Sequence, residues 1–165
     1  MTYTGPFTYT LHLSGREKRV LQKTDALGKP TRFTKVVNKS RVPKIYVLQQ
    51  DQELVYIGYA SQGIGTRLGQ GLRANGNNGY HGYKWKTVHR LQLHVFVFNQ
   101  TLEGNNHNSD QPYIKLAEAV EAELVYLVRS KTGSWPKYQN EIHFNNDNLS
   151  KAKEVAIEMY NLLAP

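Results

Sequence analysis

The chain has 165 residues, a net charge of +8, no cysteine and a hydrophobic content of 39%. This length fits one domain with a real core, and this hydrophobic content is too high for a disordered chain. Without cysteine there are no disulfides or thiolate metal sites, so any metal must be held by oxygen or imidazole. No apolar stretch approaches the roughly 20 residues that span a bilayer, and residues 2–14 do not resemble a signal peptide. We therefore expect a cytoplasmic protein with no membrane segment.

The N-terminal quarter carries the whole excess of positive charge. Residues 1–44 contain ten Lys/Arg and two acids, whereas residues 45–165 contain eleven of each. Such a surface attracts polyanions, of which nucleic acid is the commonest, although a solvated basic segment with no specific partner remains the alternative. The pattern from Phe7 to Leu13 alternates, Thr31 to Val37 is β-rich, and Gly28-Lys29-Pro30 is a turn between them. We interpret residues 1–42 as a basic N-terminal extension with a strand or two, not as a separate domain.

Two apolar runs, Lys44 to Gln49 and Glu53 to Tyr59, predict a β-hairpin joined by Gln50-Asp51-Gln52. A loop centred on Asp51 pairs Ile45 with Ile57, Tyr46 with Tyr56, and Val47 with Val55. This register places the four aliphatic residues on one face and sets the two tyrosines side by side on the other.

A helix is predicted from about Ile64 to Ala74, because apolar residues recur every four positions and would face the sheet. Its glycines (63, 65, 69 and 71) are unusual, since an interior glycine costs about 1 kcal/mol relative to alanine. Close approach by a ligand and close approach by another element are both open explanations. The apolar stripe comprises Ile64, Leu68 and Leu72, and Arg67 lies beside it.

Val88 to Asn99 predicts a third strand, with its odd-numbered aliphatic residues alternating against Gln92, His94, Phe96 and Phe98. An Asn-rich loop follows, and Ser109-Asp110 are candidate N-caps before Pro112. The strongest predicted helix runs from there to about Arg129. Its apolar stripe is Tyr113, Leu116, Val120, Leu124, Leu127 and Val128. A last helix is expected near Leu149 to Leu163, with Ala152, Val155, Met159 and Leu163 inward.

The order of these parts resembles the GIY-YIG nuclease superfamily over roughly residues 43–143. Lys44-Ile45-Tyr46 stands at the first motif, with lysine in place of its glycine, and Tyr56-Ile57-Gly58 matches the second. Arg67 has the spacing of the superfamily's helix arginine. A glutamate on the later helix and Asn140 match the remaining positions, although the gap between these two is long. The resemblance implies an α+β fold with a small three-stranded antiparallel sheet flanked by helices, to which this chain adds the extension and a C-terminal helix (144–165).

The resemblance also implies hydrolysis of DNA phosphodiester bonds with one divalent metal, Mg²⁺ or Mn²⁺. Tyr46 would be the base that takes the proton of the attacking water, which requires its pKa to be lowered. Tyr56 would orient the phosphate or the water, and Arg67 would bind the non-bridging oxygens. His81 would transfer protons or touch phosphate. The residues expected to contact nucleic acid are Lys44, Arg73, Lys84 and Lys86.

Two glutamates on the later helix, Glu121 and Glu123, are candidates for the metal ligand. They lie about 200° apart around a helix, on opposite sides of the apolar stripe, so the amphipathic pattern does not separate them. Glu123 is preferred because it shortens the distance to Asn140, and Glu121 is kept in reserve.

Three functions compete for this sequence. The first is a magnesium-dependent DNA endonuclease, which as a homodimer or by two successive nicks would cut both strands. The second is a non-catalytic nucleic-acid-binding module that retains the nuclease fold. The third is a structural domain whose basic N-terminus meets an acidic partner. The presence of both tyrosines, the arginine and a glutamate favours the nuclease, since binding alone does not require a carboxylate beside an arginine.

Overall fold

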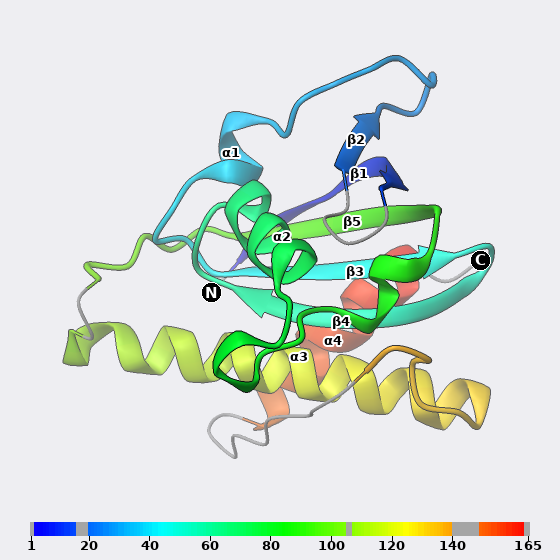
Figure 1. Cartoon of the computed structure of the whole chain (residues 1–165). Helices are drawn as coiled ribbons and strands as arrows, with labels where there is room; N and C mark the ends of the chain where they lie inside the picture. The colour runs from blue at the N-terminus through cyan, green and yellow to red at the C-terminus, as the bar shows by residue number, and fades with distance from the viewer. Residues whose placement is uncertain (1, 16–19, 105–106, 140–148, 164–165) are drawn as a thin grey trace.

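A computed structural model describes residues 2–15, 20–104, 107–139 and 149–163 of the chain. The fold is α+β, as predicted, with one antiparallel sheet in the strand order β2-β1-β5-β3-β4 (Figure 1). The strands are β1 (Tyr3–Ser14), β2 (Val20–Thr24), β3 (Lys44–Gln50), β4 (Glu53–Ala60) and β5 (Arg90–Phe98). The α-helices are α1 (Lys35–Asn38), α2 (Ile64–Arg73), α3 (Gln111–Thr132) and α4 (Leu149–Leu163). Short 3₁₀ turns are η1 (Asn77–Gly79), η2 (Lys84–Thr87) and η3 (Asn108–Asp110).

The expectation of a three-stranded sheet is wrong, because the N-terminal extension adds two strands to the same sheet. Strand β1 pairs along β5, with Leu11 opposite Leu91, and β2 pairs with β1 at the sheet edge. The alternation from Phe7 to Leu13 has a simple cause here, since Tyr9, Leu11 and Leu13 are buried in the core.

The β-rich segment Thr31 to Val37 does not form a strand, and its last residues instead form the single turn α1. Tertiary packing overrides β-propensity at this position. Val37 is fully buried, and the Asn38 side-chain oxygen accepts a hydrogen bond of 2.9 Å from the Gly65 N–H in the first turn of α2. The turn therefore joins the extension to the start of α2.

The hairpin forms, but its register is two residues away from the predicted one. Tyr46 is opposite Gly58 rather than Tyr56, because the turn is only Asp51-Gln52 and a bulge follows Leu48. Asp51 adopts φ 55°, a left-handed conformation that aspartate tolerates in tight turns. A shift of two residues preserves the faces of a strand. Both tyrosines accordingly lie on one side of the sheet, as predicted.

Two apolar clusters cover the two faces of the sheet, and strand β5 contributes to both. Its odd-numbered residues 91–97 pack in the cluster under α2, whereas Phe96 and Phe98 pack in the cluster under α3 and α4. The α2 stripe of Ile64, Leu68 and Leu72 is buried as predicted. Ile45, Val47 and Ile57 share the face opposite the tyrosines, as expected, and this face packs against α3. Val55 lies on the tyrosine side instead, because the bulge displaces it.

The two C-terminal helices lie together on one side of the sheet (Figure 1). The predicted start of α3 is confirmed, with Pro112 in its first turn, and α4 buries its four predicted inward residues. Asp110 precedes α3, but its side chain does not cap the helix. The carboxylate instead accepts hydrogen bonds from the backbone N–H groups of Glu103 and Gly104. No helix within the described residues is both long and apolar enough to cross a membrane.

Candidate active site

A pocket of about 520 Å³ lies at the β4 edge of the sheet. Arg67 reaches it from α2 on one face of the sheet, and Glu121 reaches it from α3 on the other. This meeting is possible because β4 is an edge strand, so side chains from both faces converge around it. The pocket is lined by Tyr56, Tyr59, Arg67, Gly79, Tyr80, His81, Gly82, Tyr83, Glu118, Glu121 and Gln139.

Tyr46 lies beneath this pocket and is fully buried. Its hydroxyl shares a 2.9 Å hydrogen bond with the hydroxyl of Tyr83, and its ring is 5.8 Å from that of Tyr56. Burial raises the pKa of Tyr46 well above 10, and the neighbouring phenols raise it further, whereas Arg67 lowers it by less. The requirement that its pKa be lowered is therefore not met, and Tyr46 is a neutral hydrogen-bonding group at physiological pH.

Gly58, the glycine of the second motif, leaves room for the Tyr46 ring. The two residues are cross-strand partners, and a Cβ at position 58 would overlap the end of that ring. Glycine at position 58 therefore has a steric explanation, since a larger residue would push the Tyr46 ring out of the core and away from Tyr83.

Gly58→Ala is expected to lower the free energy of unfolding by about 1–3 kcal/mol, because the core must move to admit a methyl group. Chemical denaturation measures this loss. Gly69→Ala is the matched control, because a Cβ there meets only the movable guanidinium of exposed Arg73. Removal of a helix-interior glycine should stabilise the protein by up to about 1 kcal/mol. Equal effects of the two changes would contradict the steric role of Gly58.

Tyr83 is a site residue that the sequence reading did not select. Its ring stacks on buried Trp85 at 4.5 Å, and the Arg67 guanidinium lies 5.8 Å from its ring centroid. A Cβ at Gly71 would overlap the Tyr83 ring, and one at Gly63 would overlap the Asn38 backbone. Gly71 in α2 and Gly63 just before it therefore admit other parts of the protein rather than a ligand. Of the two, Gly71 was the available signal that a side chain packs closely on this helix.

Arg67 is half-buried, and its guanidinium is held among aromatic rings at the pocket. Its Nε is buried without a hydrogen-bond partner in the described parts of the chain. The charge of Arg67 acts on Glu121 across the pocket, where it lowers the pKa of that carboxyl. A cation and an acid from separate helices thus face one cavity, as the sequence predicted for Arg67.

The preference for Glu123 as the metal ligand is corrected in favour of Glu121. Glu121 lines the pocket together with Glu118, one helical turn earlier, whereas Glu123 does not line it. Burial raises the pKa of Glu121 to about 7, although the Tyr59 backbone N–H lowers it. Glu118 was not selected from the sequence, but its spacing of three residues from Glu121 could have indicated it.

The raised pKa of Glu121 predicts a pH-dependent cost to stability in the metal-free protein. A carboxyl with a pKa of about 7 when folded and 4.5 when unfolded stabilises the fold below pH 4.5. This contribution is lost as the pH rises through 7. Glu121→Gln should therefore be more stable than the wild type at pH 8, by at most about 3 kcal/mol, and equally stable near pH 4. Thermal unfolding in EDTA measures this, with Glu123→Gln as control; a pH-independent difference would contradict it.

His81 lies on the pocket wall, as the expected role in proton transfer or phosphate contact requires. Its ring packs against Gly76, where a Cβ would meet it. Lys86 donates two hydrogen bonds of 2.8 Å, to the backbone oxygens of Ala74 and His81, and so fixes this loop. Lys84 and Arg73 are exposed, which leaves them available for the predicted contacts with nucleic acid.

The prediction that Lys44 contacts nucleic acid is wrong, because its side chain has no exposed surface. Its Nζ donates to the backbone oxygens of Val42 at 2.6 Å, Lys39 at 2.7 Å and Gln62 at 3.3 Å. Burial, followed by the nearby charge of Lys39, lowers the pKa of Lys44 to about 8. This lysine ties the entry of β3 to the segment after β4, so its role is structural.

Lys44→Met is expected to destabilise the protein by about 1–3 kcal/mol, because three carbonyl groups lose their donor. Urea unfolding measures the change. Lys84→Met is the exposed counterpart and should alter stability by less than about 0.5 kcal/mol. If Lys44→Met unfolded at the wild-type urea concentration, the ammonium would not be a structural group.

Asn140, the expected terminal asparagine, lies outside the described residues. The residue before it, Gln139, lines the pocket, and its side-chain amide bonds both the N–H and the C=O of Ile57 at 3.1 Å. The Tyr138 N–H also donates to the Val55 oxygen. The segment that leads to Asn140 is thus held along the free edge of β4, beside the pocket.

Glu118 and Glu121 make the pocket suitable for Mg²⁺, a hard cation that prefers carboxylate and water oxygens. In the ranges that the structure describes, no group of three or more His, Cys, Asp or Glu could enclose a metal. Mg²⁺ is commonly held by only one or two carboxylates, with water and substrate phosphate completing its shell. The donor set therefore fits a metal shared with a phosphate ligand better than a closed structural site.

Comparisons with protein-family models, with curated proteins and with solved structures found no match for this chain. Its function must accordingly be inferred from the geometry of the pocket, in which Arg67, Glu121 and Tyr56 converge above the buried Tyr46 and Tyr83.

Proposed function

We propose that the chain is a Mg²⁺-dependent endonuclease that hydrolyses phosphodiester bonds in DNA at a site of GIY-YIG type. The observation that carries the proposal is the convergence of Arg67 from α2 and Glu121 from α3 on one pocket beside Tyr56. A cation for the phosphate and a carboxylate for the metal are the two groups that this reaction requires.

Arg67 binds the non-bridging oxygens of the scissile phosphate, because its planar fork matches two oxygens at once. Its side chain lines the pocket, and none of the ion pairs found among the described residues involves it. Tyr56 is half-buried at the pocket wall and orients the phosphate or the attacking water through its hydroxyl. Both residues are held by the fold before substrate arrives, which is the condition for effective charge stabilisation.

His81 is assigned as the proton acceptor, since its imidazole lies on the pocket wall and imidazole is the commonest general base. The water oxygen forms the new bond to phosphorus, its proton passes to His81, and the bond to the leaving oxygen breaks. Mg²⁺ held by Glu121 would supply positive charge to the leaving oxygen. Tyr46 remains protonated and acts as a positioning residue, because its hydrogen bond holds Tyr83 under Arg67.

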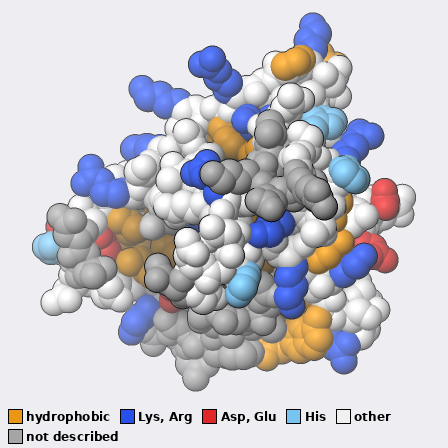
Figure 2. Space-filling model, viewed as in Figure 1, with side chains coloured by type: hydrophobic (Ala, Val, Ile, Leu, Met, Phe, Trp, Pro, Cys, Tyr) orange, Lys and Arg blue, Asp and Glu red, His pale blue; other side chains and the backbone are white. Residues whose placement is uncertain are grey.

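The surface around the pocket is suited to a polyanion. On the face that carries α2, basic side chains are widely spread and acidic ones are few (Figure 2). Among the described residues of the extension and α1, the exposed basic ones are Lys29, Arg32, Lys35, Lys39 and Arg41. Charges of this kind bind phosphates and position DNA without reading its sequence.

The proposal is tested by incubating supercoiled plasmid DNA with the purified protein and Mg²⁺, and again with EDTA. Conversion to nicked or linear DNA is expected with Mg²⁺ and not with EDTA. Cleavage that persists in EDTA would contradict the metal-dependent mechanism. Salt-sensitive binding of DNA without cleavage would instead support the second candidate, a nucleic-acid-binding module that retains the nuclease fold.

A further inference from the structure

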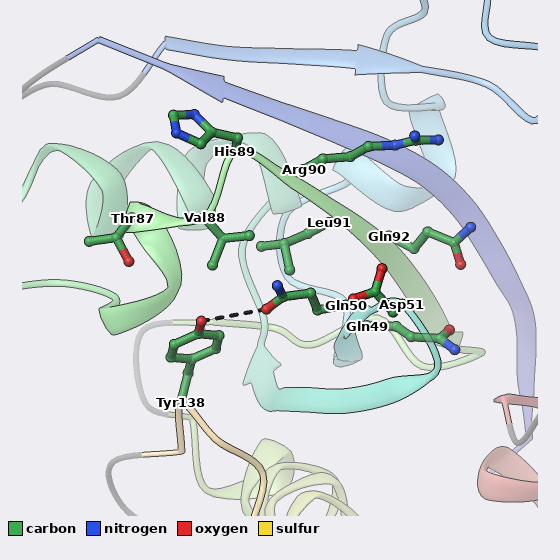
Figure 3. Close-up of a pocket in the computed structure, with 10 residues that line it drawn as sticks. All are labelled: Gln49, Gln50, Asp51, Thr87, Val88, His89, Arg90, Leu91, Gln92 and Tyr138. Atoms are coloured by element: carbon green, nitrogen blue, oxygen red, sulfur yellow. Dashed lines mark hydrogen bonds between the residues drawn. The ribbon is translucent and has the colours of Figure 1, made fainter.

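A second, larger pocket of about 670 Å³ lies where the β3–β4 turn meets the start of β5. Figure 3 shows Tyr138 and Gln50 facing each other across it, with the side chains of Val88 and Leu91 beside them. His89 and Arg90 lie at one rim, and both are exposed. None of the residues assigned to catalysis lines this pocket.

The lining combines a flat aromatic ring, aliphatic side chains, three glutamine side-chain amides and the carboxylate of Asp51. The Tyr138 hydroxyl and the Gln50 Oε1 lie 3.5 Å apart, the long limit of a hydrogen bond, so both groups are available to a ligand. This combination suits a nucleobase, since its faces stack on aromatic or apolar groups and its edge exchanges hydrogen bonds with amides. At the rim, the positive charge of Arg90 and the ring N–H of His89 suit the phosphate attached to the same nucleotide.

This pocket and the candidate active site are lined by successive stretches of the same two chain segments. The chain from Gly79 to Tyr83 lines the active site, and its continuation from Thr87 to Gln92 lines the second pocket. On the other side, Gln139 lines the active site and the adjacent Tyr138 lines the second pocket. A DNA strand with a phosphate at Arg67 would reach the second pocket by following these two segments.

The concave shape limits which nucleotides enter. A base in an intact duplex is paired and stacked, and its edges are read by groups that project into a groove. A recess receives a base only after that base has left the stack. The cost of unstacking is least for a base that is already unpaired.

We infer that the second pocket binds the base of an unpaired nucleotide next to the scissile phosphate. The preferred substrate is then DNA with a bulge, a flap or a single-stranded junction. The inference rests on the proposed nuclease function for the position of the cut, but base binding itself requires no cleavage.

The test compares two fluorescein-labelled duplexes that differ only in a single bulged nucleotide, either deoxyadenosine or an abasic residue. Fluorescence anisotropy in EDTA measures both affinities. Wild-type protein should bind the adenosine bulge about tenfold more tightly than the abasic one, because stacking and an amide contact are lost with the base. Gln50→Ala and Tyr138→Ala should each reduce this ratio at least about threefold. Gln52→Ala, an exposed glutamine in the same turn that does not line the pocket, should leave it unchanged.

Circular dichroism verifies that each variant is folded. If Tyr138→Ala does not fold, the affinity ratio of Gln50→Ala alone tests the inference. Equal wild-type affinity for the two duplexes, or an unchanged ratio in Gln50→Ala, would overturn the inference. A base-dependent ratio without cleavage in Mg²⁺ would overturn the proposed nuclease while supporting the pocket. Cleavage in Mg²⁺ without a base-dependent affinity ratio would support the proposed nuclease and overturn the base-binding pocket.

Discussion

Replacing Arg67 with alanine is expected to reduce Mg²⁺-dependent cleavage of DNA about a thousandfold. The side chain lies in the pocket on the opposite wall from Glu121, and Arg67 is the only lysine or arginine among the described lining residues. Its loss leaves the developing negative charge on phosphate without a positioned cation, and losses of this size follow removal of a single such group. Initial rates of plasmid nicking under single-turnover conditions measure the effect.

Two further variants separate charge, geometry and overall attraction for DNA. Arg67→Lys keeps the charge but not the planar fork, so its rate should remain at least about tenfold below wild type. Arg73→Ala is the matched control, because Arg73 is exposed on the same helix and does not line the pocket. It should weaken DNA binding slightly and reduce its salt dependence, with little change in the single-turnover rate at saturation. If Arg67→Ala and Arg73→Ala cut DNA equally well, the assignment of the phosphate-binding residue would be wrong.

Replacing Glu121 with glutamine is expected to reduce cleavage at least about a hundredfold, whereas Glu123→Gln retains it. Residues that only support a metal ligand cost up to about a hundredfold when changed, so loss of the ligand itself should cost no less. The two changes are chemically identical and only two positions apart on α3, but only Glu121 lines the pocket. The comparison therefore tests position rather than charge.

Metal binding gives a readout that does not depend on catalysis. Calorimetric titration with Mn²⁺ should detect binding to the wild type and to Glu123→Gln, and little binding to Glu121→Gln. Affinity should also fall as the pH drops below about 7, since protons compete for a carboxyl whose pKa is raised to about 7. If Glu121→Gln cleaved DNA at the wild-type rate, Glu121 would not be the metal ligand, and Glu123 or another residue would have to hold the metal.

In the hairpin, sequence periodicity predicts which side chains share a face but not which residues pair across the strands. Alternation along β3 and β4 predicted that Tyr46 and Tyr56 share a face, and they do. The pairing of Tyr46 with Gly58 depended on the length of the turn and on the bulge after Leu48. These are properties of a few backbone torsions, such as the positive φ of Asp51, and hydrophobic patterns carry no information about them.

The glutamates show a second limit. Glu121 and Glu123 flank the same apolar stripe symmetrically, so the helix pattern could not choose between them. The choice depends on which side of α3 faces the free edge of β4, and this follows from the packing of α3 against the sheet. The prediction that Lys44 contacts nucleic acid was wrong for a related reason. Its charge predicted an exposed side chain, but the side chain is buried and its ammonium donates hydrogen bonds to three backbone carbonyl groups.

Sequence patterns alone predicted the α+β class, the tyrosine hairpin, the stripe of α2 and the bounds of α4, because local periodicity specifies which side of each element is buried. The extension completes the sheet through the pairing of β1 with β5, which no local pattern indicated. The packing of the elements also places Tyr83 against both Tyr46 and Arg67 and turns Glu121 toward the pocket. These outcomes depend on contacts between residues far apart in the chain, which are set by the packing of whole elements rather than by any local pattern.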